Sequence, residues 1–430
     1  MLKKLLLLLL WTLPLAANDL IPGTMPDTPV AIIHARIFTV SNGIIEDGTL
    51  VFDQGRITAV GRDVAVPENA AVIDAAGGHL YPGLIAGRTS VGLVEVGAVR
   101  ASRDVSETGL FNPNARAETA YNTDSEVTPT VRSNGVALGF VAPAGGRISG
   151  MGALIYLDGW NRNDAVVKSD AGMILNWPPV RVNRAWWNRI PEAKQLEQIK
   201  KSREELERFF DEARAYANVR AAGGETAFDI RYDSMIPVLE GRTPLVIRAN
   251  DQEQIRQAVA FCAERGLKMI LLEGADSWKV AGLLREQNVP VILRQPHSLP
   301  AREDEDYDQA FKTAAQLARA GVSFALTKTG TDNWDIRNLP FWGATMVSFG
   351  LSREDALRAL TLWPAQMFGV ADRLGSLETG REATLFLSRG DVMDYGGNAV
   401  THMFIGGRPV DLDNRQKRLY RKYSERLSRP

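Results

Sequence analysis

The stretch PLVIRANDQEQIRQAVAFCAERGLKMILLEGADSWKVAGLLREQNVPVIL, residues 244–293, decides the fold. Short apolar runs alternate in it with segments whose apolar residues recur at helical spacing, and Gly266 ends the first helical segment. The same alternation continues as far as residue 327. The predicted strands are 244–248, 268–272, 290–293 and 323–327, and the predicted helices are 251–265, 278–286 and 308–320.

Strands that alternate with helices at this spacing form parallel sheets, so the pattern predicts an α/β fold. About 300 residues of such units favour a closed barrel over an open sheet. We therefore expect a (β/α)8 barrel of the TIM type over residues 81–377. A later helix, residues 353–361, has Ser352 as its expected N-cap, with Asp355 in the capping-box position.

The two ends of the chain have a different pattern, with short alternating strands and turn residues. Asp53-Gln54-Gly55-Arg56 lies between two apolar runs and predicts a hairpin. A second strand-rich stretch follows near the other end of the chain, at residues 383–410. We expect residues 28–80 and 378–412 to pair into one small β-sandwich domain. Residues 413–430 form a basic tail, for which a solvated helix is the simplest interpretation and a surface contact the alternative.

The first 17 residues have the pattern of a secretory signal peptide. Lys3 and Lys4 precede the apolar run Leu5–Trp11, and small residues follow at Ala16 and Ala17. This run is too short to cross a bilayer, and no later stretch is long and apolar enough to do so. We expect export to the periplasm, with secretion from the cell as the alternative, and a mature protein without a transmembrane segment.

The charge balance gives no sign of nucleic-acid binding, because 50 Lys and Arg against 51 Asp and Glu leave a net charge of -1. Cys262 is the single cysteine, so a disulfide within the chain is excluded. Its place in a helical apolar pattern favours a buried thiol. The sequence is compatible with a homo-oligomer.

Three sequence blocks carry a resemblance to a known family. DAAGGHLYPGLI at residues 74–85 resembles the start of the barrel of the amidohydrolase superfamily, in particular its imidazolonepropionase-like members. LTLWPA at residues 360–365 and GREATL at residues 380–385 resemble the exit from that barrel. The resemblance implies a barrel with a sheet domain built from both chain ends. It also implies hydrolysis, usually of C–N bonds, by divalent ions, usually zinc, held by His and Asp at the ends of barrel strands.

This sequence has other residues where the resemblance places those metal ligands. The His-x-His after the first barrel strand is replaced by Arg88-Thr89-Ser90, and the histidines of the fifth and sixth strands by Arg248 and Glu273. Lys328-Thr329 stands where the family has its Asp. The resemblance also implies, for many members of the family, a modified lysine after the fourth strand. Residues 173–176, the expected fourth strand here, contain no lysine, and the nearest is Lys168. We predict no metal and no other cofactor.

The histidine count agrees with this alignment. The chain has four histidines, and three of them, His34, His79 and His402, fall in the expected sheet domain. Only His297 is left for the barrel. Carboxylates such as Glu95, Asp104, Glu107, Glu273 and those at residues 303–306 could build an oxygen-rich Ca or Mg site instead, although isolated surface carboxylates are usually solvated.

The substituted positions now carry cations. Because the strand ends of a barrel converge, Arg88, Arg248 and Lys328 should meet near Glu273, and unpaired buried cations there would be costly. One interpretation is a salt-bridge network that fills the former metal site. The other is a site for the carboxylate or phosphate of a small ligand, to which Ser90, Thr329, Arg294 and His297 could contribute. The candidate catalytic residues are His297, as a general base, and Glu273.

Two functional hypotheses follow. The first is a catalytically silent relative of the amidohydrolases that binds a ligand or a partner. The alternative is an active hydrolase of C–N bonds, in dipeptides or non-peptide amides, with an atypical or absent metal centre. A plugged barrel that acts through its outer surface is a third. Trp177, Trp186 and Trp187 could form a lid that stacks on a ligand, or they could serve packing.

Overall fold

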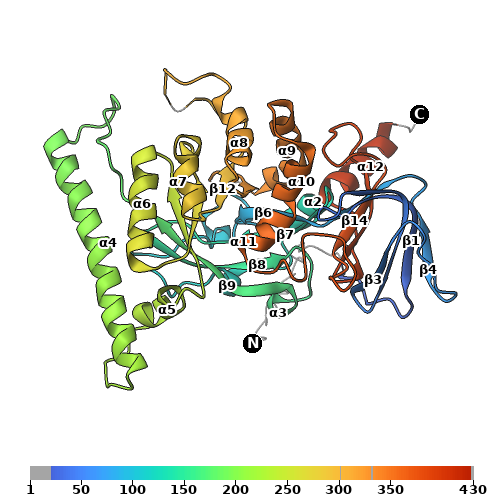
Figure 1. Cartoon of the computed structure of the whole chain (residues 1–430), viewed down its shortest axis with the longest axis horizontal. Coiled ribbons are helices and arrows are strands. Elements are labelled where there is room, and N and C mark those ends of the chain that lie inside the picture. The colour runs from blue at the N-terminus through green and yellow to red at the C-terminus, as the bar shows by residue number, and fades with distance from the viewer. Residues whose placement is uncertain (1–20, 301, 331–332, 428–430) are drawn as a thin grey trace, which may run out of the picture.

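The computed structural model of the chain describes residues 21–300, 302–330 and 333–427. The expected signal peptide, residues 1–17, lies outside this part. Figure 1 shows a barrel with helices around it and, beside it, a sheet domain in which N-terminal strands, coloured blue, and C-terminal strands, coloured red, lie together. No helix among the described residues is both long enough and apolar enough to cross a bilayer.

The sheet domain combines strands from both chain ends. Its strand order is β16-β15-β14-β5-β1-β2-β3, and β4 also pairs with β1. The antiparallel pairing of β14 with β5 joins the two ends. Ile32, Leu50 and Phe404 are among the side chains that form an apolar core of its own. The prediction of a small β domain from both termini is thus confirmed. Its strands are β1 (Val30–Phe38), β2 (Ile44–Asp53), β3 (Arg56–Gly61), β4 (Ala71–Asp74), β5 (His79–Pro82), β14 (Leu385–Ser388), β15 (Val400–Ile405) and β16 (Arg408–Pro409).

The barrel is closed, as predicted. Its eight strands follow the order β10-β11-β12-β13-β6-β7-β8-β9 around the ring. They are β6 (Leu84–Thr89), β7 (Val136–Val141), β8 (Ile148–Tyr156), β9 (Val166–Asn176), β10 (Leu245–Ala249), β11 (Met269–Glu273), β12 (Val291–Arg294) and β13 (Phe324–Thr327).

One strand departs from the regular βα repeat, because β8 runs antiparallel to both β7 and β9 while the other barrel neighbours are parallel. The links before and after β8 are too short for the crossover of a dozen or more residues that parallel neighbours need. Gly145 and Gly146, both with positive φ, make the turn into β8. The glycine-rich segment therefore reverses the chain within the barrel.

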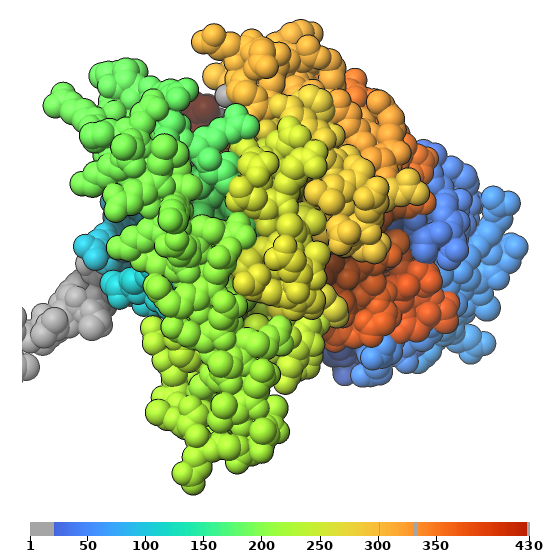
Figure 2. Space-filling model, turned by 60° about the vertical axis from the view of Figure 1, so that its left-hand side comes forward, coloured from blue at the N-terminus to red at the C-terminus, as the bar shows by residue number. Residues whose placement is uncertain are grey.

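Helices cover the outside of the barrel, and Figure 2 shows α4 in front, with α6 and α7 beside it. The α-helices are α1 (Ala117–Ala120), α2 (Val127–Arg132), α3 (Arg162–Ala165), α4 (Glu192–Ala221), α5 (Ile230–Leu239), α6 (Gln252–Arg265), α7 (Ala281–Glu286), α8 (Gln309–Arg319), α9 (Leu339–Ser348), α10 (Arg353–Leu360), α11 (Leu362–Met367) and α12 (Arg415–Leu427), and the 3-10 helices are η1 (Arg100–Ser102), η2 (Ser277–Val280) and η3 (Trp334–Asn338).

Helix ends follow the local signals in the sequence. Asp251 caps α6 in a full capping box with Gln254, and Gly266 ends this helix in the left-handed conformation. The hydroxyl of Ser352 accepts a hydrogen bond from the backbone N–H of Asp355, so the predicted N-cap of α10 is confirmed. Cys262 is buried, as expected, and burial raises the pKa of its thiol to about 12.

Candidate functional site

The barrel mouth, formed by the C-terminal ends of the parallel strands, contains the charged residues predicted from the sequence. Arg88 lies on β6, Arg248 on β10, and Glu273 is the last residue of β11. Ser90 directly follows β6, and residues 328–329 directly follow β13. Parallel barrel strands end at one face, so these positions converge there.

Arg88 is the most buried cation of the mouth, with 8% of the residue exposed. One Nη donates a hydrogen bond of 2.9 Å to the carbonyl oxygen of Gly330. Its Nε is buried and has no hydrogen-bond partner among the described residues. Burial lowers the pKa of Arg88 to about 10, while the charge of Glu273 raises this pKa and that of Arg248 lowers it. Arg88 therefore points into the mouth, within the field of both residues.

Glu273 is held from two sides. Its Oε1 lies 2.8 Å from Nε of Arg248, and its Oε2 accepts a 2.8 Å hydrogen bond from the side-chain amide of Asn250. The carboxylate is buried, whereas the side chain of Arg248 is 49% exposed. Glu273 also has a φ of 73°, in the left-handed region that few residues other than glycine adopt. Such backbone strain persists where surrounding contacts hold it, often at functional sites.

Lys328 and Thr329 have other partners than the sequence suggested. Nζ of Lys328 lies 2.8 Å from Oδ2 of Asp335, in η3, so the expected meeting of this cation with Glu273 is replaced by a local ion pair. The backbone N–H of Thr329 donates to Oε1 of Gln295 over 3.0 Å, and Nε2 of Gln295 donates to the threonine hydroxyl. The segment after β13 is thus fixed to the loop after β12.

Ser90 holds the opposite side of the same segment. Its hydroxyl donates to Oδ1 of Asn333, whose amide donates over 2.8 Å to the carbonyl oxygen of Val94. The hydroxyl of Thr327 donates to the carbonyl oxygen of Arg88 over 2.7 Å. These contacts fix the backbone around Arg88.

His297 lies away from this group. Its Nε2 is 3.5 Å from the hydroxyl of Thr345 on α9, and its ring contacts Phe311 on α8 edge to face. Both partners are on outer helices, so the structure does not bring His297 together with Glu273. A base at the mouth would have to come from elsewhere.

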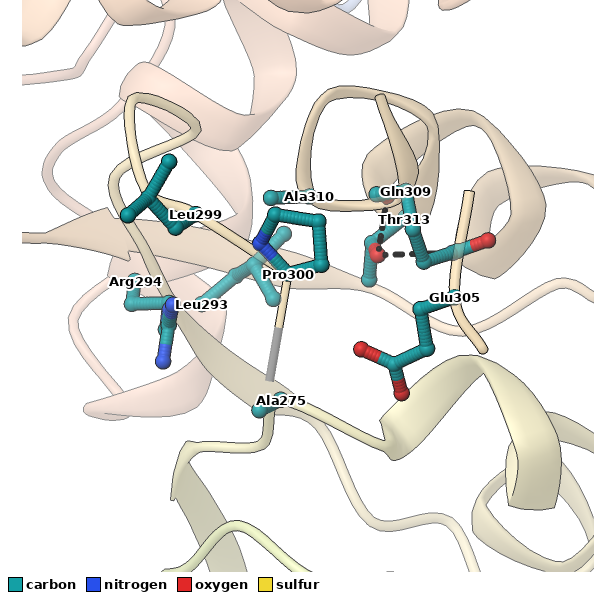
Figure 3. Close-up of a pocket in the computed structure, with 9 residues that line it drawn as sticks. All are labelled: Ala275, Leu293, Arg294, Leu299, Pro300, Glu305, Gln309, Ala310 and Thr313. Atoms are coloured by element: carbon teal, nitrogen blue, oxygen red, sulfur yellow. Dashed lines mark hydrogen bonds between the residues drawn. The ribbon is translucent and has the colours of Figure 1, made fainter. Parts of the chain in front are cut away.

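Arg294, the last residue of β12, borders a small pocket beneath the loop after that strand. Figure 3 shows Pro300 at its centre, with Arg294 and Leu299 on one side and Glu305 on the other. Its free volume is about 30 Å³, room for roughly two water molecules. A ligand of substrate size does not fit there.

The acidic segment 303–306 takes part in ion pairs, and one of the three tryptophans named above takes part in packing. Glu305 lies within ion-pair distance of Lys279 and Arg302, so its carboxylate faces cations. Trp177 is buried, and its ring contacts Phe261. Trp186 and Trp187 are exposed. The three tryptophans therefore do not form one lid, and Trp177 serves packing.

Three larger hollows lie outside the mouth among the described residues. One, of about 340 Å³, is lined by residues of the sheet domain, including Phe38 and Tyr81, and by Arg353 and Leu357 of α10. The other two lie at the opposite end of the barrel and share Pro290, directly before β12, in their linings. In TIM-type barrels the strand ends at that face serve stability rather than catalysis.

No protein-family model matches the chain. An imidazolonepropionase of Erwinia tasmaniensis is 34% identical over 126 residues, which are 29% of this chain and 25% of that protein. The match thus spans about a quarter of the relative's length. The crystal structure of an amidohydrolase from Thermotoga maritima superposes with a TM-score of 0.78 at 22% identity, covering 89% of this chain and 99% of that one.

The chain has the fold of the amidohydrolase superfamily. The structure of a molinate hydrolase agrees, with a TM-score of 0.55 at 17% identity over 91% of this chain and 96% of that one. The resemblance expected from the three sequence blocks is confirmed. At these identities, the likeness to solved structures establishes the fold and not the chemistry.

The described residues at the strand ends of the mouth do not offer the donor set of a zinc centre. Zinc takes three or four His, Cys, Asp or Glu ligands. Among these residues only Glu273 is of such a type, and Arg248 contacts one of its oxygens and Asn250 the other. Arg88 and Lys328 bring positive charge to the place of the ion. These residues fit an anion better than a divalent cation.

Several site residues were missed at the sequence level. Asn250 follows β10 by one residue, and the rule that polar residues after parallel strands face the mouth could have found it. Gln295 directly follows β12, so the same rule could have found it, whereas Asp335 and Asn333 carried no comparable signal. Their roles depend on how the loops after β12 and β13 fold over the mouth.

Proposed function

We propose that the barrel mouth binds a small anion, a carboxylate or a phosphate, and that the chain is a catalytically silent binding relative of the metal-dependent amidohydrolases. The observation that carries this proposal is the buried guanidinium of Arg88, whose Nε lacks a hydrogen-bond partner among the described residues. A buried charged group without its full set of partners is costly, so its retention suggests a ligand.

The charge balance of the mouth supports the proposal. Glu273 is neutralised by Arg248, and Lys328 by Asp335. Among the described residues, Glu273 is the carboxylate whose charge acts on Arg88, and it forms its ion pair with Arg248. Because Arg248 is half exposed, a small solute can reach this place from the solvent. Guanidinium groups bind carboxylate and phosphate through paired, charge-assisted hydrogen bonds.

The test is titration calorimetry of the purified protein with inorganic phosphate, acetate, succinate and citrate. At least one should bind, and Arg88→Met should weaken its binding about tenfold or more, because one charge-assisted hydrogen-bonding group contributes roughly 1.5–3 kcal/mol. Arg242→Met is the matched control. Arg242 is an exposed cation paired with Glu240, and it lies near the opposite end of the barrel. Equal loss in both variants, or no binding by the panel, would contradict the proposal.

Metal analysis and activity assays test the proposed lack of catalysis separately from anion binding. We expect less than stoichiometric zinc in the purified protein and no turnover of dipeptides or cyclic amides with or without added zinc. Stoichiometric zinc together with chelator-sensitive turnover would overturn catalytic silence, whatever the outcome of the anion titration.

A second candidate is a hydrolase of C–N bonds with an atypical centre. It is favoured by Glu273, a buried carboxylate on a left-handed backbone between cations, because strained charged residues cluster at active sites. In that case Glu273 would take a proton from the attacking water and return it to the leaving nitrogen as the C–N bond breaks, while Arg88 and Arg248 would stabilise the developing oxyanion. Turnover that Glu273→Gln abolishes at unchanged substrate affinity would favour this candidate.

A further inference from the structure

Helix α12 (Arg415–Leu427) lies on the outside of the molecule and buries none of its residues (Figure 1). Tyr420 is 75% exposed, Tyr423 53% and Leu427 87%, and Leu419 is also exposed. At 3.6 residues per turn these four positions share one side of the helix. They form an exposed apolar stripe, which we call the α12 stripe.

Ion pairs lie on the side of α12 opposite the stripe. Nη2 of Arg421 lies 2.7 Å from Oδ2 of Asp413, in the segment before the helix, and Nη2 of Arg418 lies 3.4 Å from Oε2 of Glu126, the residue before α2. Arg418 and Arg421 are three residues apart and lie opposite the α12 stripe on the helix. The first turn is held on the stripe side, because Gln416, one turn before Tyr420, accepts a 2.8 Å hydrogen bond from the hydroxyl of Thr130. Beyond that turn the stripe is exposed to solvent, with Tyr420 at 75% and Leu427 at 87%.

The charges of α12 are strongly one-sided. Among residues 415–427 there are six cations, Arg415, Lys417, Arg418, Arg421, Lys422 and Arg426, and one carboxylate, Glu425. By helical geometry, Arg415, Lys422 and Arg426 lie along one edge of the α12 stripe, and Lys417 lies beyond the other edge. An apolar side with tyrosines, flanked by Lys and Arg, is the arrangement of helices that lie in a membrane surface.

We propose that α12 is a membrane-surface helix that docks the protein on an anionic lipid bilayer. The α12 stripe would enter the boundary between headgroups and acyl chains, and the flanking cations would face the lipid phosphates. A second copy of the chain fits this surface poorly, because two equally cationic helices would repel each other. The proposal is independent of the anion site at the barrel mouth.

The test is co-sedimentation of the full-length protein with vesicles of phosphatidylglycerol and phosphatidylcholine, and with vesicles of phosphatidylcholine alone. We expect binding to the anionic vesicles only, and weaker binding at high salt, because salt screens the lipid charge. Tyr420→Ser combined with Leu427→Ser should reduce the partition coefficient about tenfold or more. Lys422→Gln combined with Arg426→Gln should reduce it roughly fivefold for each charge removed.

Tyr395→Ser is the matched control, because Tyr395 is an exposed tyrosine in the loop between β14 and β15. It should bind anionic vesicles as the unchanged protein does. Circular dichroism should show equal folding of all variants, since the replaced side chains are exposed. No vesicle binding, equal binding to neutral vesicles, or unchanged binding by the stripe variant would overturn the proposal. So would stripe-dependent self-association without vesicle binding.

Discussion

At the scale of single residues, Arg88 and Glu273 show how differently two buried charges of one site can be satisfied. Both carboxylate oxygens of Glu273 have donors, on Arg248 and Asn250. Arg88 shares a hydrogen bond with the carbonyl oxygen of Gly330 and keeps a buried Nε without a partner among the described residues. The first arrangement stabilises the fold, and the second is what a ligand site requires.

Arg88→Met should therefore separate binding from stability. We expect the free energy of unfolding to rise by about 1 kcal/mol, because an apolar side chain of similar length replaces an incompletely paired buried charge. Urea unfolding in the absence of ligand measures this difference. A loss of stability of similar size would mean that Arg88 serves the fold, and it would count against a ligand site.

Arg248→Met should have the opposite effect on stability. It leaves the buried carboxylate of Glu273 without its counter-ion, which should cost about 1–3 kcal/mol in the free energy of unfolding. The double variant Arg248→Met/Glu273→Gln should recover most of that loss, because the remaining amide carries no charge. If Arg248→Met and the double variant had equal free energies of unfolding in urea titrations, the loss would not come from the unpaired charge of Glu273.

At the scale of elements, the segment between β12 and α8 is attached to the start of η2 by a charged cluster. The buried carboxylate of Asp276 contacts Arg302 and lies 3.4 Å from Nζ of Lys279, and Glu305 contacts the same two cations. Burial raises the pKa of Asp276, but the hydrogen bonds from Arg302 and the backbone of Gln252 outweigh it, so this pKa lies below its usual value. The cluster holds a loop that forms part of the rim of the mouth.

This cluster predicts a pH dependence. A carboxyl group whose pKa is lower in the folded state stabilises that state above its unfolded pKa of 3.8, and this contribution is lost as the pH falls. The hydrogen-exchange protection factors of residues 295–300 and 302–308, which compare each rate with the intrinsic rate at the same pH, should therefore fall on acidification below about pH 4. In Asp276→Asn the segment should exchange fast already at neutral pH and respond less to acid. Asp306→Asn, which changes an exposed ion pair, is the control and should behave like the unchanged protein.

At the scale of the whole molecule, the sheet domain and the barrel meet where the chain passes from β5 to β6. Gly83 lies at this crossing, and its N–H donates over 2.9 Å to the carbonyl oxygen of Thr384. A Cβ at Gly83 would lie 2.5 Å from Cβ of Ala137, on β7, and 3.0 Å from Cγ2 of Thr384. The close approach of three chain segments explains why this position in the Pro82-Gly83-Leu84 motif is glycine.

Gly83→Ala should thus lower the free energy of unfolding by about 1–3 kcal/mol, the usual cost of overpacking. Gly282→Ala is the matched control, because Gly282 lies in α7 and a methyl group there would have no other atom within 4 Å beyond its own turn of helix. This substitution should be neutral or stabilise by about 0.5–1 kcal/mol, as alanine favours the helix. Thermal unfolding of both variants compares them, and equal midpoints would show that the crossing tolerates a side chain.

The sequence by itself determined the closed barrel, the sheet domain from both chain ends and the positions of Arg88, Arg248 and Glu273 at strand ends. It could do so because the periods of strands and helices are local, and parallel strands all end at one face. Only the tertiary structure decided that β8 runs backwards, that Lys328 pairs with Asp335, and that His297 faces outer helices. These features depend on the path of loops and on contacts between residues distant in the sequence, and local periodicity does not predict either.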